Sequence, residues 1–100
     1  METQLKKGLL DAYVLALLKR EDTYGYKLFY DVASVIEISE STLYPILRRL
    51  EQQEFLATYQ LEHNGRLRKY YRLTPQGVIR LEYYKRQCED LKLIIDRIFW

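Results

Sequence analysis

Side chains able to contact nucleic acid gather within one short stretch, from Ile38 to Gln52. Apolar residues recur there at intervals of three and four, which places them on one face of a helix: Leu43, Ile46, Leu47 and Leu50. At about 100° per residue, polar and cationic groups occupy the opposite face: Ser41, Tyr44, Pro45, Arg48 and Gln52, with Thr42 and Arg49 on its flank. Hydroxyls near the N-terminal end and arginines further along can contact bases and phosphates in a DNA major groove. The alternative is an ordinary amphipathic surface helix.

The start of this helix depends on two serines and a proline. Ser39 and Ser41 are both suitable N-caps, since a serine hydroxyl can accept a hydrogen bond from a backbone N–H of the first turn. Pro45 cannot donate a backbone hydrogen bond and normally destabilises a helix interior by about 3 kcal/mol. We therefore expect the helix to begin near Ser41 or Thr42, with an irregular first turn. The predicted DNA contacts of this stretch are Ser39, Ser41, Thr42, Tyr44, Arg48 and Arg49.

A basic β-hairpin is predicted immediately after this helix. Residues 55–62 and 66–74 have the composition of strands, and Asn64-Gly65 between them favours a two-residue type I′ turn. That turn would place Thr58 opposite Tyr71. The second strand carries four cations, of which the first three are predicted DNA contacts: Arg66, Arg68, Lys69 and Arg72. The alternative is a solvated edge strand that its charge protects from aggregation.

Residues able to catalyse a reaction are sparse and are not grouped. His63 stands alone at the tip of the predicted hairpin, and Cys88 lies in an apolar seam rather than in an electropositive site. The chain has neither a glycine-rich phosphate loop nor the spacing of metal-binding side chains. We therefore expect no enzymatic activity and no site for a metal or cofactor.

Two helices are predicted before the DNA-contacting stretch. Leu5–Lys19 is apolar almost all round, which predicts burial on more than one side. Asp22 or Thr23 can cap a second helix from about residue 24 to residue 34. Its expected core face consists of Tyr26, Phe29, Tyr30, Val32 and Ala33. The β-branched run at 35–38 would lead to the Ser39 cap, either extended or as a minor strand.

A long final helix provides a predicted dimer contact. Thr74 and Pro75 form a helix start, with threonine as N-cap and proline at the first helical position. Toward Trp100, apolar residues recur every three and four positions, as in a coiled-coil seam: Leu81, Tyr84, Cys88, Leu91, Ile95 and Ile98. A second copy is the simplest cover for this seam, and the first helix is expected to complete the interface with Leu9, Tyr13 and Leu17. The alternative is that the helix folds back on its own domain.

The composition fits a small domain with a partner. One hundred residues make a single domain, and 48% hydrophobic content is a large fraction for so small a chain to bury alone. The net charge of +2 attracts nucleic acid weakly, so DNA binding depends on local clusters of cations. The single cysteine excludes an internal disulfide, and neither a signal peptide nor a membrane-spanning run is visible. We expect a cytoplasmic protein without membrane contact.

Together these elements predict a mainly α fold with a small β-hairpin. Residues 1–74 would form a winged helix-turn-helix that binds DNA, and residues 75–100 a dimerisation helix, in one compact unit. The chain resembles the PadR family of transcriptional regulators in its small form, over about residues 9–77. The resemblance is carried by Tyr24–Tyr26, Ser41–Pro45 with Arg49–Glu51, and Gly65–Gly77. It implies a homodimeric repressor that binds a near-palindromic operator in double-stranded DNA. A winged helix used only for protein–protein contact is the competing class.

Some residues depart from the family pattern. Ser41 and Glu54 stand where relatives usually have glycine, and Leu67 replaces a proline of the wing. Glu54 should therefore have either ordinary backbone angles or strained ones.

The resemblance also implies a small aromatic effector, because many relatives respond to one. Aromatic residues that could line its pocket between subunits are Tyr13, Tyr84, Phe99 and Trp100. We favour the simpler interpretation that these aromatics are the core of the dimer.

Overall fold

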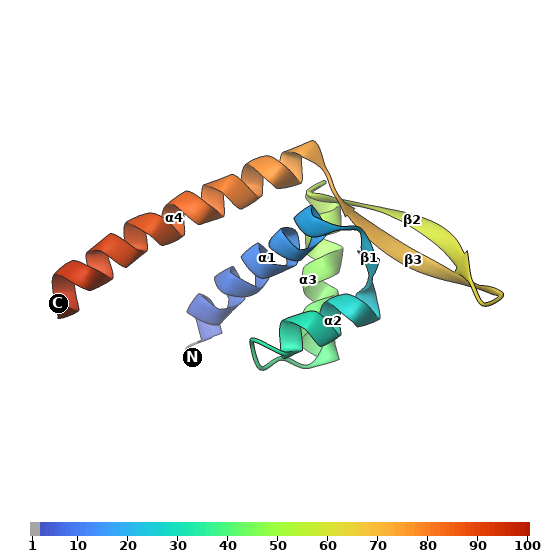
Figure 1. Ribbon diagram of the computed structural model, residues 1–100, viewed down its shortest axis with the longest axis horizontal. Coiled ribbons are helices and arrows are strands. Elements are labelled where there is room, and N and C mark those ends of the chain that lie inside the picture. Colours follow the sequence, from blue (N-terminus) through green and yellow to red (C-terminus); the bar gives the residue numbers. More distant parts are fainter. Residues whose placement is uncertain (1–2) are drawn as a thin grey trace.

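The computed structural model describes residues 3–100, with the backbone alone for residues 3–5. Its elements follow the predicted order with one added short strand, β1: α1 (Thr3–Arg20), β1 (Thr23–Tyr24), α2 (Gly25–Ala33), α3 (Glu40–Gln52), β2 (Leu56–His63), β3 (Arg66–Leu73) and α4 (Pro75–Phe99). Three helices form the body, and the β2–β3 hairpin and α4 project from it in opposite directions (Figure 1). The predicted mainly α fold with a β-hairpin wing and a long final helix is confirmed.

The core lies where α1, α2, α3 and the base of the hairpin meet. Its fully buried side chains are aliphatic: Leu10, Leu15, Leu28, Leu43, Leu47, Leu50, Val14 and Val32. The four apolar residues predicted for α3 are all buried, which confirms the phase of that helix. On α1, a second set is half-buried and lies to the side of the core: Leu9, Tyr13 and Leu17.

The predicted core face of α2 was partly wrong. Tyr26 and Tyr30 are 61% and 68% exposed, whereas Leu28 and Val32 are buried. The helix begins at Gly25 because Thr23 and Tyr24 pair with β3 as a short strand, and no side chain caps it. Tyrosine tolerates exposure better than leucine does. Counting the two tyrosines as core residues therefore put the predicted buried face of α2 on the wrong side.

α3 begins at Glu40, with Ser39 as its N-cap and Pro45 inside the helix. Pro45 leaves the Ser41 carbonyl without its usual N–H partner, and the exposure of Ser41 allows water to supply one. The run at 35–38 leads into α3 without forming a strand.

α3 ends in a Schellman-type turn. The Phe55 N–H donates to the Leu50 carbonyl at 3.0 Å, and the Glu54 N–H donates to the Glu51 carbonyl at 2.9 Å. Glu54 occupies the left-handed position of this turn, with a φ of 65°. Of the two outcomes expected at this residue, the strained one is observed, since glycine is the usual residue there.

The hairpin has the predicted turn and register. Asn64 and Gly65 both have positive φ, at 51° and 77°, as a type I′ turn requires. Thr58 pairs with Tyr71 as expected, and β1 adds a third antiparallel strand on the other side of β3.

The junction between the hairpin and α4 is tightly built. The Thr74 hydroxyl accepts a hydrogen bond from the Gly77 N–H at 3.0 Å, which confirms the predicted cap. The same hydroxyl donates to the Glu54 carbonyl at 2.7 Å. Gly77 is buried, and a Cβ at this position would overlap the Phe55 carbonyl and the Leu73 side chain. The junction therefore requires glycine.

Candidate nucleic-acid interface

The exposed face of α3 carries two of the predicted contact residues, Ser41 and Arg48, at its centre. Ser41, Pro45, Arg48 and Gln52 are all exposed, and they lie opposite the four leucine and isoleucine side chains that anchor the helix. Arg48 projects from the middle of this face. The helix therefore presents a cation and a hydroxyl to the outside while its other side is fixed in the core.

A small network of hydroxyls marks the N-terminal end of α3. Ser39 Oγ lies 2.9 Å from Ser41 Oγ and 3.1 Å from Thr42 Oγ1, and all three residues are exposed. Ser39 makes no side-chain capping bond to the backbone. Each hydroxyl can rotate to donate or accept, so the group suits contact with base edges or phosphate oxygens.

Tyr44 is half-buried, and its ring sets the spacing between α2 and α3. A Cβ at Gly25 would lie 2.9 Å from Tyr44 Cε1, so glycine at this position lets the Tyr44 ring approach α2 closely. Burial is the main cause that raises the pKa of Tyr44 above its usual value. A tyrosine is protonated at neutral pH in any case, so the phenol can donate a hydrogen bond.

Arg49 is held within the body of the protein. Its Nη2 atom donates to Asp11 Oδ1 of α1 at 2.6 Å, and Asp11 is only 5% exposed. Tyr84 of α4 donates to the other Asp11 oxygen at 3.4 Å. Burial, followed by the charge of Asp11, raises the pKa of Tyr84, so this phenol remains a donor. One carboxylate thus joins α1, α3 and α4.

The role of Asp11 was missed by the sequence-based prediction. It is the one acidic residue in the apolar run from Leu9 to Leu18. A buried carboxylate requires a cation or hydrogen-bond donors. That requirement was the available signal, although the sequence did not indicate which arginine would meet it.

Side-chain contacts with Asp22 and Tyr24 hold the β2–β3 hairpin, which carries the cations of the wing. Tyr59 Oη donates to Asp22 Oδ2 at 2.6 Å, and the Tyr59 ring stacks on Tyr70 with centroids 5.7 Å apart. The Arg68 guanidinium lies 4.2 Å from the centre of the Tyr24 ring. These contacts fix the hairpin relative to the helices, so its charged strand keeps a defined position beside α3.

The three predicted wing contacts differ in their surroundings. Lys69 donates to Glu51 of α3 at 3.3 Å, whereas Arg68 is half-buried against Tyr24. Arg66 is exposed beside the turn and pairs across the hairpin with His63. Arg66 and Lys69 are thus both exposed, but Lys69 is paired with Glu51.

The predicted dimer residues divide into two groups. Those nearest the body are half-buried: Leu9, Tyr13, Leu17, Leu81 and Tyr84. Those further along α4 are exposed: Cys88, Leu91, Ile95 and Ile98. Between α1 and α4 lies a groove of about 320 Å³, lined mainly by apolar side chains that include Leu9, Tyr13, Leu81, Tyr84 and Cys88.

The geometry agrees with the family comparison. Residues 14–83 match the model of the transcriptional regulator PadR-like family, a span that includes the last two turns of α1, the wing and the start of α4. The chain belongs to the PadR-like family. It is therefore a DNA-binding transcriptional regulator with a winged helix-turn-helix fold, in a family of regulators rather than enzymes.

Solved structures and a sequence relative extend the match along the chain. A PadR family regulator from Eggerthella lenta is 37% identical, with a TM-score of 0.85 over 96% of this chain and 86% of the other. A Streptococcus transcriptional regulator is 30% identical, with a TM-score of 0.89 over 97% and 98% of the two chains. A Lysinibacillus sphaericus protein is 32% identical over 96% of this chain and 93% of its own.

Among the described residues, none of the helices is sufficiently long and apolar to span a membrane.

Proposed function

We propose that this PadR-like protein is a homodimeric repressor that binds a near-palindromic operator. In this proposal residues 1–74 contact the DNA, and residues 75–100 join the two subunits. The observation that carries the proposal is the apolar surface left uncovered along the second half of α4.

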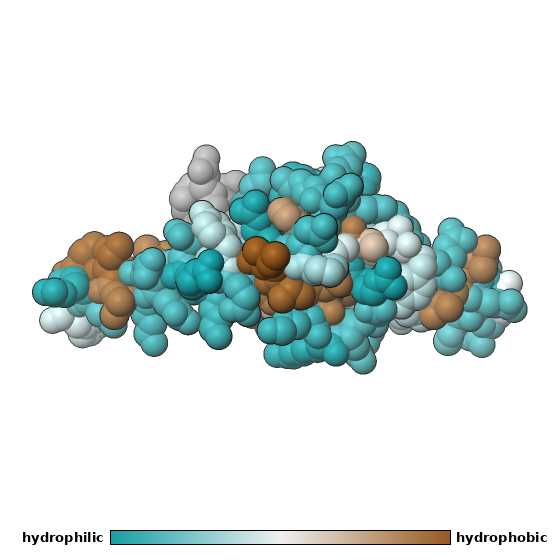
Figure 2. Space-filling model, turned by 90° about the horizontal axis from the view of Figure 1, so that it is seen from above, coloured by the Kyte–Doolittle hydropathy of each residue, from teal (hydrophilic) through white to brown (hydrophobic). Residues whose placement is uncertain are grey.

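This half of α4 makes little contact with its own chain. Every residue from Lys85 to Trp100 is exposed, and Leu93, Ile98 and Phe99 are each about two-thirds exposed, at 66%, 66% and 69%. Figure 2 shows apolar surface gathered at the far end of this helix. Burying one large apolar side chain contributes about 1.5–3 kcal/mol, so covering several of them would stabilise an association strongly.

A second copy is the occupant that fits this surface. The half-buried residues of α1 and the first turns of α4 border a groove, and the exposed seam continues directly from it along α4. A two-fold arrangement would let the α4 seam of each subunit cover the groove of the other. Leu91, Ile95 and Ile98 would then be buried, as would Leu9 and Tyr13. Large apolar patches of this kind mark association surfaces.

Dimerisation also increases the number of DNA contacts and places two recognition helices on one DNA molecule. One subunit with a net charge of +2 makes few phosphate contacts, and a dimer doubles them. Two recognition helices related by two-fold symmetry would enter successive major grooves, roughly 34–36 Å apart. A dimer covering both grooves would exclude polymerase from an overlapping promoter, which is the simplest basis for repression. The protein would act in the cytoplasm, where the operator is.

The groove is also the natural place for an effector. Tyr13 and Tyr84 supply aromatic rings to its lining, which suits a small aromatic molecule. Side chains of the partner subunit are the simpler occupants, so an effector would have to bind beside them. A winged helix used only for protein contact, the competing class considered from the sequence, gives no reason for the exposed Arg48 and Arg66.

Two acidic substitutions within the seam, L91D and I95D, test the dimer. They would bury unpaired charge at the proposed interface, which is strongly unfavourable. The double variant should sediment as a folded monomer and lose operator binding in a mobility-shift assay on the same sample. The control is R86Q with K92Q, which changes the net charge equally but keeps the seam apolar.

Two results would count against this proposal. A double variant that stays dimeric would place the contact elsewhere. A folded monomer that binds the operator as tightly as the unaltered protein would show that dimerisation does not present the recognition helices.

A further inference from the structure

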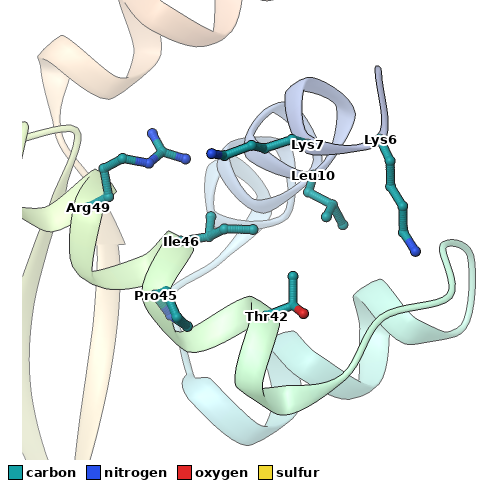
Figure 3. Close-up of a pocket in the computed structure, with 7 residues that line it drawn as sticks. All are labelled: Lys6, Lys7, Leu10, Thr42, Pro45, Ile46 and Arg49. Atoms are coloured by element: carbon teal, nitrogen blue, oxygen red, sulfur yellow. The ribbon is translucent and has the colours of Figure 1, made fainter. Parts of the chain in front are cut away.

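Two lysines near the start of α1 lie beside the recognition helix. Lys6 and Lys7 border a cleft of about 540 Å³ between α1 and α3, as Figure 3 shows. The other lining residues come from both helices: Leu10, Thr42, Pro45, Ile46 and Arg49. The cleft therefore has an apolar floor, a hydroxyl and three cationic groups, and none of its lining residues within the described part of the chain is acidic.

This cleft is on the opposite flank of α3 from the wing. On one flank, Glu51 accepts hydrogen bonds from Thr58 and Lys69 of the hairpin. On the other, Arg49 pairs with Asp11 of α1. At about 100° per residue, Glu51 and Arg49 lie on either side of the exposed face that carries Ser41 and Arg48. The recognition face is thus bordered by the wing on one side and by the start of α1 on the other.

A helix in a major groove meets phosphates on both of these flanks. The groove is about 12 Å wide, and a helix with its side chains is about 10–12 Å across. Each flank of the helix therefore faces one of the two sugar–phosphate backbones. The wing offers cations to one backbone, and the second backbone needs cations from another part of the protein.

The three cationic side chains of the cleft differ in whether they are already paired with an acidic group. The Arg49 guanidinium is already paired with Asp11 at 2.6 Å. Within the described part of the chain, no acidic group lies within ion-pair distance of Lys6 or Lys7. Lys7 is exposed and Lys6 is half-buried, with its ammonium at the cleft. Two positive charges, those of Lys6 and Lys7, thus lie beside the helix.

We propose that Lys6 and Lys7 form a third DNA-contacting element, which binds backbone phosphates on the side of α3 away from the wing. This inference rests on the proposed docking of α3 in the major groove. Lysine suits the role because its ammonium is a compact charge on a flexible stem that can follow a phosphate. The contact adds affinity without adding sequence information.

The test is the salt dependence of DNA binding by the full chain carrying K6Q and K7Q, measured by fluorescence anisotropy. Loss of two phosphate contacts should reduce the slope of log K against log salt by about 2 per half-site. Binding near 0.1 M salt should weaken by on the order of tenfold to a hundredfold, equally on operator and random DNA.

Two further variants serve as controls. K19Q with R20Q removes the same charge from the exposed other end of α1 and should keep most of the slope. K6R with K7R keeps the charge and should restore the slope.

The outcomes separate this inference from the function on which it rests. An unchanged slope in the glutamine variant, while the unaltered protein binds its operator, would overturn the inference and leave the proposed function intact. An equal loss in the K19Q/R20Q control would also overturn it, since net charge would then be the cause. Absence of any DNA binding by the unaltered protein would overturn the proposed function itself.

Discussion

Replacing Arg49 with alanine tests whether this residue belongs to the scaffold or to the DNA-contacting surface. The substitution would leave Asp11, which is 5% exposed, with the Tyr84 hydroxyl at 3.4 Å as its remaining side-chain donor. Breaking a fully buried pair costs about 3–5 kcal/mol, whereas a surface pair contributes about 0–1 kcal/mol. The Arg49 side chain is 35% exposed, so the pair lies between these limits. We expect the free energy of unfolding to fall by about 2 kcal/mol.

Urea denaturation at a fixed protein concentration measures this change, because any dimer would make stability depend on concentration. The double variant with Asp11 also replaced by alanine should be less destabilised than the two single variants together. The coupling between the two sites should be about 1 kcal/mol or more. The variant R48A, which removes an exposed arginine one residue away, is the matched control and should unfold like the unaltered protein.

The same variants separate the two roles of Arg49 in DNA binding. If Asp11 holds the guanidinium in place, R49A should lower the affinity for operator DNA and for random DNA by similar factors under conditions in which the variant is folded. Unaltered stability in R49A, together with a selective loss of operator binding, would refute this reasoning. Arg49 would then contact bases, which is one of the two roles that the sequence allowed for it.

Two backbone positions give further predictions. E54G should raise the free energy of unfolding by about 0.5–1 kcal/mol, because glycine adopts the φ of 65° at the end of α3 without strain; a lower midpoint in thermal denaturation would contradict this. G77A should lower it by about 1–3 kcal/mol, because the added methyl would overlap the Phe55 carbonyl and lie 2.5 Å from Leu73 Cδ1. A G77A variant with an unchanged urea midpoint would show that this junction can relax.

Features that depend on local chemistry could be predicted from the sequence. Asn64-Gly65 determines the turn and hence the register of the whole hairpin, and Thr74-Pro75 determines the start of α4. The apolar spacing in α3 is strict, so its buried face was predicted correctly, whereas Tyr44 and Arg49, placed on or beside the exposed face, are half-buried.

Features that depend on long-range partners could not be predicted. β1 exists because Thr23 and Tyr24 meet β3, which is distant in sequence, and this pairing moved the start of α2. Two tyrosines were assigned to the core face of α2 because of their apolar rings, although Tyr26 and Tyr30 are exposed in the structure. The ion pair of Arg49 joins residues 38 positions apart, so its charge was counted toward the DNA surface. Periodicity defines one face of a helix, but it does not identify the groups on neighbouring elements.

Arg48 provides the most direct test of the claim that α3 recognises DNA sequence. The measurement is the affinity of the unaltered protein and of R48A for DNA from upstream of the gene, each compared with a scrambled fragment at the same salt concentration. Arg48 is exposed at the centre of the recognition face, so R48A should lose about 1–3 kcal/mol of specific binding, with a smaller loss on scrambled DNA. Unchanged discrimination between the two fragments by folded R48A would contradict the account.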